Sequence, residues 1–278
     1  MELLFGSMAW TWETNPVYFG TLHIIYLLLA PALAVGISYL LRNNTLRQSK
    51  IVFLAIGVFL IFTEVYKLLF YVFVVPPVGI FPMWVFSWQL CSIPMYICIV
   101  IPFIKNERIL NALYDFLLAF AGLGGVMMLF EPSGAFSIDH IVLTFHSIIW
   151  HTLLLFLAAY VVVTRRAAKR IRDYVLALIV FFVCAALAEV FNTIVRFTMP
   201  TDNQMNMFFI SPFQRTPIAV FKDIWDVGGP ALAIPVYLFA ISLGGFLFHV
   251  CGYFVRRALI KHQIKKYKIY RKTRLTKL

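Results

Sequence analysis

The chain has 278 residues, of which 62% are hydrophobic and only 13% are charged. Soluble domains average about 45–50% apolar and about 25% charged residues, so this composition excludes an ordinary soluble protein and predicts a polytopic membrane protein. The formal net charge of +12 lies in short basic runs between apolar segments. Such runs are typical of topology signals and lipid headgroup contacts, and we therefore expect no binding of nucleic acid.

The four cysteines, Cys91, Cys98, Cys184 and Cys251, all lie inside apolar segments, and none of them belongs to a CxxC pair. This spacing predicts neither a disulfide framework nor a metal site, and we expect no cofactor. Residues 1–16 also lack the basic start of a cleavable signal peptide.

Seven segments are long enough to cross a membrane, since a helix needs about 20 apolar residues to span the hydrocarbon core. In chain order they cover residues 16–41, 51–75, 85–104, 109–130, 139–163, 174–197 and 230–255. We therefore predict an all-α fold, a polytopic membrane bundle of seven transmembrane helices. Residues 1–255 would form the transmembrane domain, and residues 256–278 a basic cytoplasmic tail.

Positive charge alternates between the two ends of these helices. The loops after the first, third and fifth segments are basic, whereas residues 1–15 and the loops after the second and fourth segments contain no Lys or Arg. By the positive-inside rule the N-terminus lies outside and the C-terminus is cytoplasmic. The tail itself has two interpretations, a topology anchor and a binding site for anionic lipid headgroups.

Eight polar side chains on four predicted helices lie between mid-membrane and the outer surface, by a rise of about 1.5 Å per residue. They are Glu64, Lys67, Gln89, Cys91, His146, His151, Glu189 and Asn192. Glu64 and Lys67 lie one turn apart on the same face of their helix, so their spacing predicts an ion pair. Each polar residue alone is explained by a hydrogen bond between helices. Polar groups in a bilayer are costly, however, and four helices that supply one layer predict a polar cavity open toward the outer leaflet.

A thiol together with imidazoles is typical of nucleophilic catalysis on an ester. An imidazole would convert the Cys91 thiol to a thiolate, which attacks a lipid ester and holds the acyl group as a thioester. Gln89, Asn192 or Lys67 would stabilise the oxyanion. His146 and His151 point about 140° apart on an ideal helix, so the spacing predicts that one of them faces Cys91, and depth favours His146. A metal site would need a third ligand such as Glu189, and the spacing favours it less.

The run Gln89-Leu90-Cys91-Ser92-Ile93 resembles the motif that opens the third helix in the YwaF-like family of bacterial integral membrane proteins. The resemblance covers most of the chain, through Gly124-Gly125, Glu131-Pro132, the pair His146 and His151, Asn206-Met207 and residues 226–230. That family is similar to the plasmalogen-forming acyltransferase transmembrane protein 164. It is more remotely similar to the androgen-induced membrane hydrolases of fatty-acid esters.

The resemblance implies a catalytic pair, because the related enzymes combine a Cys or Thr with a His on a later helix. Cys91 matches the nucleophile, and His151, followed by Thr152 and three leucines, matches the catalytic histidine more closely than His146. It further implies a bacterial plasma membrane, and it implies no established substrate for bacterial members. The substrates we expect are a phospholipid as acyl donor and a lysolipid or glycerol-type lipid as acceptor. The function we expect is a phospholipid acyltransferase or transacylase, or a hydrolase if water accepts the acyl group, with Glu64 or Glu189 orienting the imidazole.

A second hypothesis belongs to another functional class. A transporter or binding protein for a small solute would use the same polar cavity, with Glu64, Lys67, Glu189 and Arg196 as ligands. Its activity would survive Cys91→Ala and fail when Glu64 is replaced. A scaffold with only an assembly role is a third possibility.

Overall fold

The computed structural model describes the backbone of residues 6–136 and 139–275, and the side chains of these residues as far as residue 265. Within this part of the chain the regular structure is helical, and the only strand-like contact is an isolated bridge between Thr11 and His140. The predicted all-α membrane bundle is therefore confirmed.

Six helices are long and apolar enough to cross a membrane. The first two are α2 (Thr21–Leu40) and α3 (Leu46–Phe73). The third is a continuous run of α5 (Glu107–Phe116), the π-helical η3 (Leu117–Ala121) and α6 (Gly122–Phe130). The last three are α8 (Ile141–Val163), α9 (Tyr174–Thr198), which follows the short η4 (Ile171–Asp173), and α10 (Ala219–Leu275). They match six of the seven predicted segments. Short helices α7 (Ser133–Phe136) and η5 (Met207–Phe209) lie in connecting loops.

In the remaining predicted helix, residues 85–104, the first half is largely irregular backbone and the second half is helical. A short helix, η1, covers Met83–Val85, and the next helix, α4, begins only at Ile93 and runs to Val100, continued by η2 (Ile101–Phe103). Pro94 explains the late start, because proline lacks the N–H of an interior helical residue and is tolerated in the first turn. Residues 86–92 are held instead by turns such as Ser92 N–H to the Gln89 carbonyl at 2.8 Å.

This segment nevertheless runs antiparallel to α3 along the length of that helix. The Lys50 ammonium, near the start of α3, donates to the carbonyls of Pro102 and Ile104 at 2.9 and 3.1 Å. The Ser87 hydroxyl donates to Glu64, two-thirds of the way along α3. Irregular backbone at membrane depth is tolerated where it is buried in protein or lines a cavity. The count of seven crossings and the orientation stay predictions.

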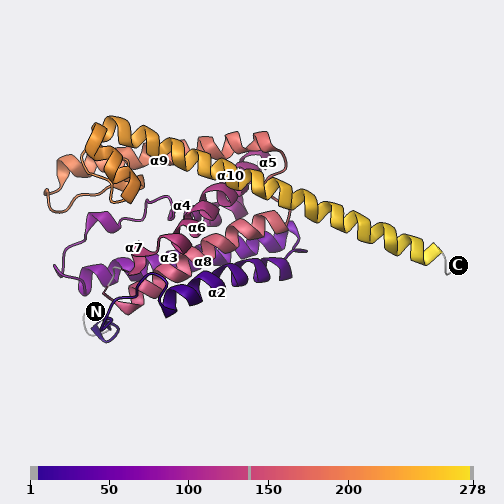
Figure 1. Ribbon diagram of the computed structural model, residues 1–278, viewed down its shortest axis with the longest axis horizontal. Helices are drawn as coiled ribbons and strands as arrows, with labels where there is room; N and C mark the ends of the chain where they lie inside the picture. Colours follow the sequence, from indigo (N-terminus) through magenta and orange to yellow (C-terminus); the bar gives the residue numbers. More distant parts are fainter. Residues whose placement is uncertain (1–5, 137–138, 276–278) are drawn as a thin grey trace.

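The run from α5 to α6 is the centre of the bundle, since 72% of its most apolar window is buried, more than in any other span. In Figure 1, α2, α3 and α8 lie on one side of it and α9 and α10 on the other, consistent with contacts of α2 with α8 and of α5 with α9. Small residues permit close packing here: a Cβ on Gly125 would lie 2.8 Å from Leu155 Cγ, and one on Gly245 would lie 2.9 Å from Phe120 Cε1.

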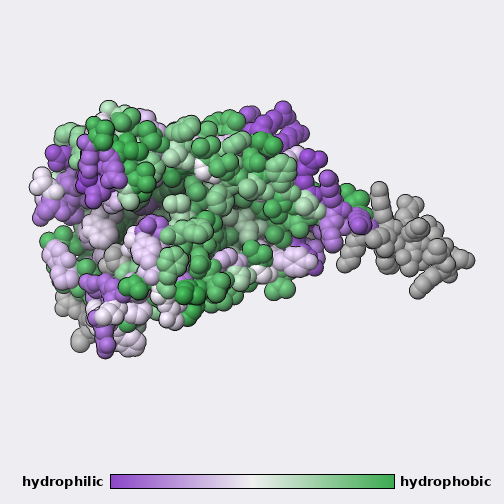
Figure 2. All heavy atoms as spheres, in the orientation of Figure 1, coloured by the Kyte–Doolittle hydropathy of each residue, from purple (hydrophilic) through white to green (hydrophobic). Residues whose placement is uncertain are grey.

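The last helix bends once and then leaves the bundle. Gly229 has φ 62°, a conformation that glycine adopts without a steric cost, and Pro230 follows it. Beyond the bundle α10 continues alone (Figure 1), so the predicted boundary between residues 255 and 256 lies inside this helix. The predicted headgroup contacts of the tail fall largely on side chains 266–278, which lie outside the described residues. Figure 2 shows an apolar surface along the bundle with hydrophilic residues gathered toward its two ends, as expected for a membrane protein.

Candidate functional site

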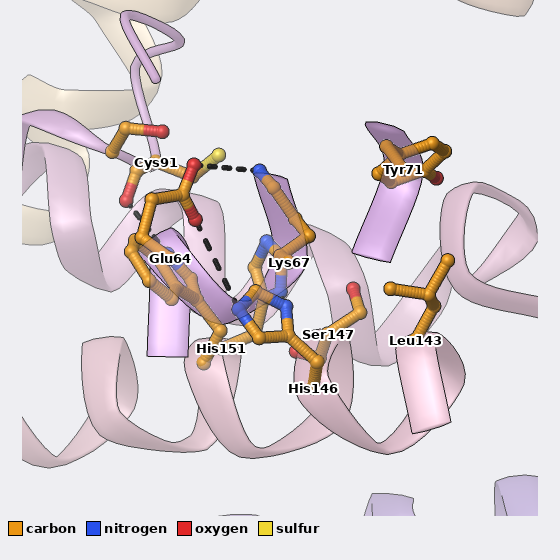
Figure 3. A pocket seen from close by; sticks show the side chains of 10 residues that line it. Glu64, Lys67, Tyr71, Cys91, Leu143, His146, Ser147 and His151 are labelled. Atoms are coloured by element: carbon orange, nitrogen blue, oxygen red, sulfur yellow. Dashed lines mark hydrogen bonds and ion pairs between the residues drawn. The ribbon is translucent and has the colours of Figure 1, made fainter. Parts of the chain in front are cut away.

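A cavity of about 160 Å³ lies between α3, α8 and the irregular segment before α4. Five of the eight side chains predicted to share a polar layer line it: Glu64, Lys67, Cys91, His146 and His151 (Figure 3). The other lining residues are Tyr71, Ser92, Leu143, Ser147 and Trp150. Since one water occupies about 30 Å³ of liquid, the cavity has room for several waters or for one small reacting group.

Cys91 is fixed in place by its own backbone. The Trp150 indole Nε1–H of α8 donates to the Cys91 carbonyl at 2.9 Å, which ties the irregular segment to the helix that carries both histidines. Cys91 is a free thiol and is half-buried. The sequence did not single out Trp150. Its only signal was that a buried indole N–H in a membrane needs an acceptor.

Glu64 is the centre of a buried charged network. The residue is 3% exposed, and its Oε1 lies 2.6 Å from Lys67 Nζ and also accepts a hydrogen bond from the Ser87 hydroxyl. Its Oε2 lies 3.9 Å from His146 Nε2. Glu64 and Lys67 are three residues apart and so share one face of α3, as their spacing predicted. A carboxylate at this depth requires such compensation.

The two imidazoles are held in different ways. His151 Nδ1 lies 2.8 Å from the Ser147 carbonyl. A carbonyl only accepts, so this contact assigns the proton to Nδ1 and leaves the Nε2 lone pair free in the neutral ring. Among the described residues His146 Nε2 has no hydrogen-bond partner, and it faces Glu64, while its ring packs on Trp150 with centroids 5.4 Å apart.

The expectation that one histidine alone faces Cys91 stays a prediction, and both histidines line the Cys91 cavity. The cavity spans the α8 surface between the two side chains, and an imidazole is long enough to reach it from either edge. Helical spacing gives the direction of each Cβ and does not give the width of the cavity opposite. The choice between the two histidines therefore depends on their hydrogen bonds.

Three of the predicted cavity residues do not line the cavity, and two of them, Gln89 and Asn192, hold a loop. Gln89 Nε2 donates to the Asn206 carbonyl at 2.9 Å, and its Oε1 accepts from Phe208 N–H at 2.8 Å. Asn192 contacts both the N–H and the carbonyl of Met207, at 2.6 and 3.1 Å. Glu189 accepts from Asn192 at 3.2 Å. The amides of Gln89 and Asn192 thus pair with backbone groups of loop 199–218.

Arg196 also lies away from the cavity. It is exposed near the end of α9, with its guanidinium carbon 5.7 Å from the centroid of the Phe213 ring. Of the four ligands expected for a solute site, only Glu64 and Lys67 line the cavity, and they pair with each other. The structure finds no group of three or more potential metal ligands within the residues it describes.

Comparison with known proteins identifies one family. The family model described as TMEM164 family matches residues 18–253, which include every residue that lines the cavity. No curated protein and no solved structure matches the chain.

Proposed function

Because the chain belongs to the TMEM164 family of membrane proteins, we propose that it is a membrane-embedded acyltransferase that moves an acyl chain from a phospholipid to a lysolipid. The observation that carries this proposal is the meeting of a free thiol, Cys91, with two imidazoles in one cavity. The thiol and the imidazoles come from segments about 55–60 residues apart in the chain, and an arrangement of this kind is what nucleophilic acyl transfer requires.

In the first half-reaction His151 acts as the base. Its free Nε2 takes the proton of the Cys91 thiol, and the sulfur attacks the carbonyl carbon of a phospholipid ester. The C–O bond of the tetrahedral intermediate then breaks. The leaving lysolipid oxygen receives the proton from the His151 imidazolium, and the acyl group remains on Cys91 as a thioester.

The second half-reaction reverses the roles of the same groups. The hydroxyl of the acceptor lysolipid gives its proton to His151 and attacks the thioester carbonyl. The C–S bond breaks, and the thiolate regains its proton from the imidazolium. If water takes the place of the acceptor, the product is a free fatty acid and the enzyme is a hydrolase.

Lys67 is the group best placed to stabilise the oxyanion of each intermediate. Its ammonium lines the cavity, whereas the amides of Gln89 and Asn192 are engaged with loop 199–218. Glu64 holds this ammonium at 2.6 Å and faces His146, so it acts as a positioning residue for both. Charge stabilisation of this type is strongest where water is excluded. We place the enzyme in a bacterial plasma membrane with this cavity toward the outer leaflet.

The test uses purified protein with acyl-labelled phosphatidylcholine as donor and lysophosphatidylethanolamine as acceptor. We expect Cys91→Ala to reduce transfer to the uncatalysed background, because no other nucleophile replaces the thiol. Cys251→Ala is the matched control, since Cys251 is exposed and outside the cavity, and it should transfer at the wild-type rate.

Trapping the acyl-enzyme intermediate tests the same proposal without a rate measurement. Wild-type protein quenched during turnover should carry one acyl group on Cys91 that hydroxylamine removes, as expected of a thioester. Transfer by Cys91→Ala at the wild-type rate would overturn the proposal. Uptake of a small solute that survives Cys91→Ala and fails in Glu64→Gln would favour the transporter hypothesis instead.

A further inference from the structure

A second cavity, of about 670 Å³, opens where the loop after α8 meets the start of α5. Four basic side chains line it: Arg108 of α5, and Lys169, Arg170 and Arg172 of the loop. It lies at the opposite end of the bundle from Cys91, because α8 runs 13 residues from His151 to Thr164, or about 20 Å. The two cavities can therefore be altered separately.

The cations of this cavity are not neutralised by the protein. Glu107 and Asp173 also line it, yet neither carboxylate forms an ion pair with a cation in the part of the chain that the structure describes. Lys169 donates to the neutral Asn111 side chain at 2.8 Å. The lining thus keeps four positive charges against two negative ones, with all four cations available to an anion.

Neighbouring cations at this end of the bundle have structural partners, which distinguishes them from the three arginines of the cavity. Arg166 donates to the Ser49 hydroxyl at 2.6 Å and to the Thr45 carbonyl at 2.9 Å. Arg165 donates to the Gln263 side chain. Lys50 caps the carbonyls at residues 102 and 104. These residues join neighbouring elements at this end of the bundle. In contrast, Arg108, Arg170 and Arg172 make no side-chain hydrogen bond or ion pair within the described residues.

Apolar surface adjoins the basic lining. Val175 and Leu176 of α9 line the cavity beside the cations. Ile109, Val175 and Ile179 are 49%, 55% and 55% exposed on the adjoining surfaces of α5 and α9. A ligand for this place therefore has an anionic head for the guanidinium groups and an apolar body for the helices. Guanidinium groups match the oxygens of a phosphate through paired hydrogen bonds.

We propose that this cavity binds the phosphate group of an anionic membrane lipid, with Arg108, Arg170 and Arg172 around the headgroup and the acyl chains along α5 and α9. The site is separate from the proposed acyl-transfer cavity and does not depend on its chemistry. Basic cavities between membrane helices on the positively charged side are a known mode of headgroup recognition.

Native mass spectrometry of the full-length protein released from detergent tests this site, with phosphatidylglycerol and phosphatidylcholine as probes. We expect phosphatidylglycerol to bind at least about tenfold more tightly than phosphatidylcholine. The double variant Arg170→Gln/Arg172→Gln should lower the phosphatidylglycerol affinity about tenfold or more, since each cation near a lipid surface contributes about fivefold. Both side chains are exposed, so the thermal midpoint of the variant should equal that of the wild type.

The matched control removes two exposed cations outside the cavity, in Arg47→Gln/Lys105→Gln. Its affinity for phosphatidylglycerol should stay within about twofold of the wild type. Equal losses in both double variants would overturn the site, because they would show general attraction to basic surface. A third arm adds inorganic phosphate and glycerol phosphate. Displacement of the lipid at equimolar concentration would overturn the lipid source and assign the cavity to a soluble phosphate.

Discussion

At the scale of single residues, we infer different roles for the two histidines from their hydrogen bonds. The His151 ring is oriented by the Ser147 carbonyl and keeps Nε2 free, whereas His146 faces Glu64 at 3.9 Å. We expect His151→Ala to lower kcat about 10²–10⁴-fold, the range of a lost general base. His146→Ala should have a smaller effect. Initial rates with labelled phosphatidylcholine measure both, and the reverse order of effects would assign the base to His146.

Glu64 and Glu189 form a matched pair of carboxylates, one inside the cavity and one outside it. Replacing one partner of a buried ion pair leaves the other charge uncompensated and costs about 3–5 kcal/mol. We therefore expect Glu64→Gln to lower both thermal stability and acyl transfer, because Lys67 and His146 lose their common partner. Glu189→Gln should change neither by much, since within the described part of the chain the Glu189 carboxylate accepts hydrogen bonds only from Asn192 and Thr193. Melting in detergent and transfer rates measure both effects, and equal effects of the two would contradict the positioning role.

At the scale of elements, apolar length predicted six of the helices and failed at one. The run 85–104 is as apolar as its neighbours, but Pro94 and the turns at residues 86–92 delay the helix to Ile93. Hydropathy reports that a segment can enter a membrane. It does not report that distant side chains will satisfy its backbone, as Trp150 does for the Cys91 carbonyl. The position most important for the proposed chemistry was therefore the least predictable in its local structure.

The sequence predicted the depth of the residues in the polar layer, and it did not predict which of them share the cavity. Counting the rise along each helix gives the depth of a residue and leaves its direction around the bundle open. Glu64, Lys67, Cys91 and both histidines were found in one cavity, whereas Gln89 and Asn192 at similar depth contact loop 199–218. Spacing within one helix predicted the Glu64–Lys67 pair, because both residues lie on the same element. Contacts across elements needed the fold.

The loop contacts of Gln89 give a prediction about an element. Gln89→Ala would leave Phe208 N–H and the Asn206 carbonyl without partners, and each unsatisfied buried group costs about 1–3 kcal/mol. We expect faster amide hydrogen exchange throughout residues 199–218 and a lower melting temperature. Gln204→Ala is the control, since Gln204 is a partly exposed amide on the same loop that donates to the nearby carbonyls of Met199 and Pro200. Unchanged exchange in Gln89→Ala would show that other contacts hold the loop.

At the scale of the whole molecule, the basic loops gather at one end of the bundle and the proposed catalytic cavity lies toward the other. Arg166 reaches the α2–α3 connection, and Arg256 of α10 donates to the Arg165 carbonyl at 3.4 Å, so the loops are joined at that end. Some of the basic residues that predicted the topology therefore also hold the loops together. The second cavity is lined by other cations, which do not take part in this packing. Different basic residues therefore serve the proposed lipid contact and the packing of the loops.

The path of residues 83–104 decides whether the two termini face the same compartment. Six long helices alone would put both termini on one side, whereas an additional crossing by this segment puts them on opposite sides. We predict opposite sides, because the segment runs antiparallel to α3 from Ser87 beside Glu64 to Ile104 beside Lys50. The test labels Glu13→Cys and Lys261→Cys in intact cells with a membrane-impermeant maleimide, in a Cys251→Ala background. Glu13→Cys should react directly and Lys261→Cys only after permeabilisation. Reaction of both in intact cells would mean that residues 83–104 enter the membrane and return to the side from which they came.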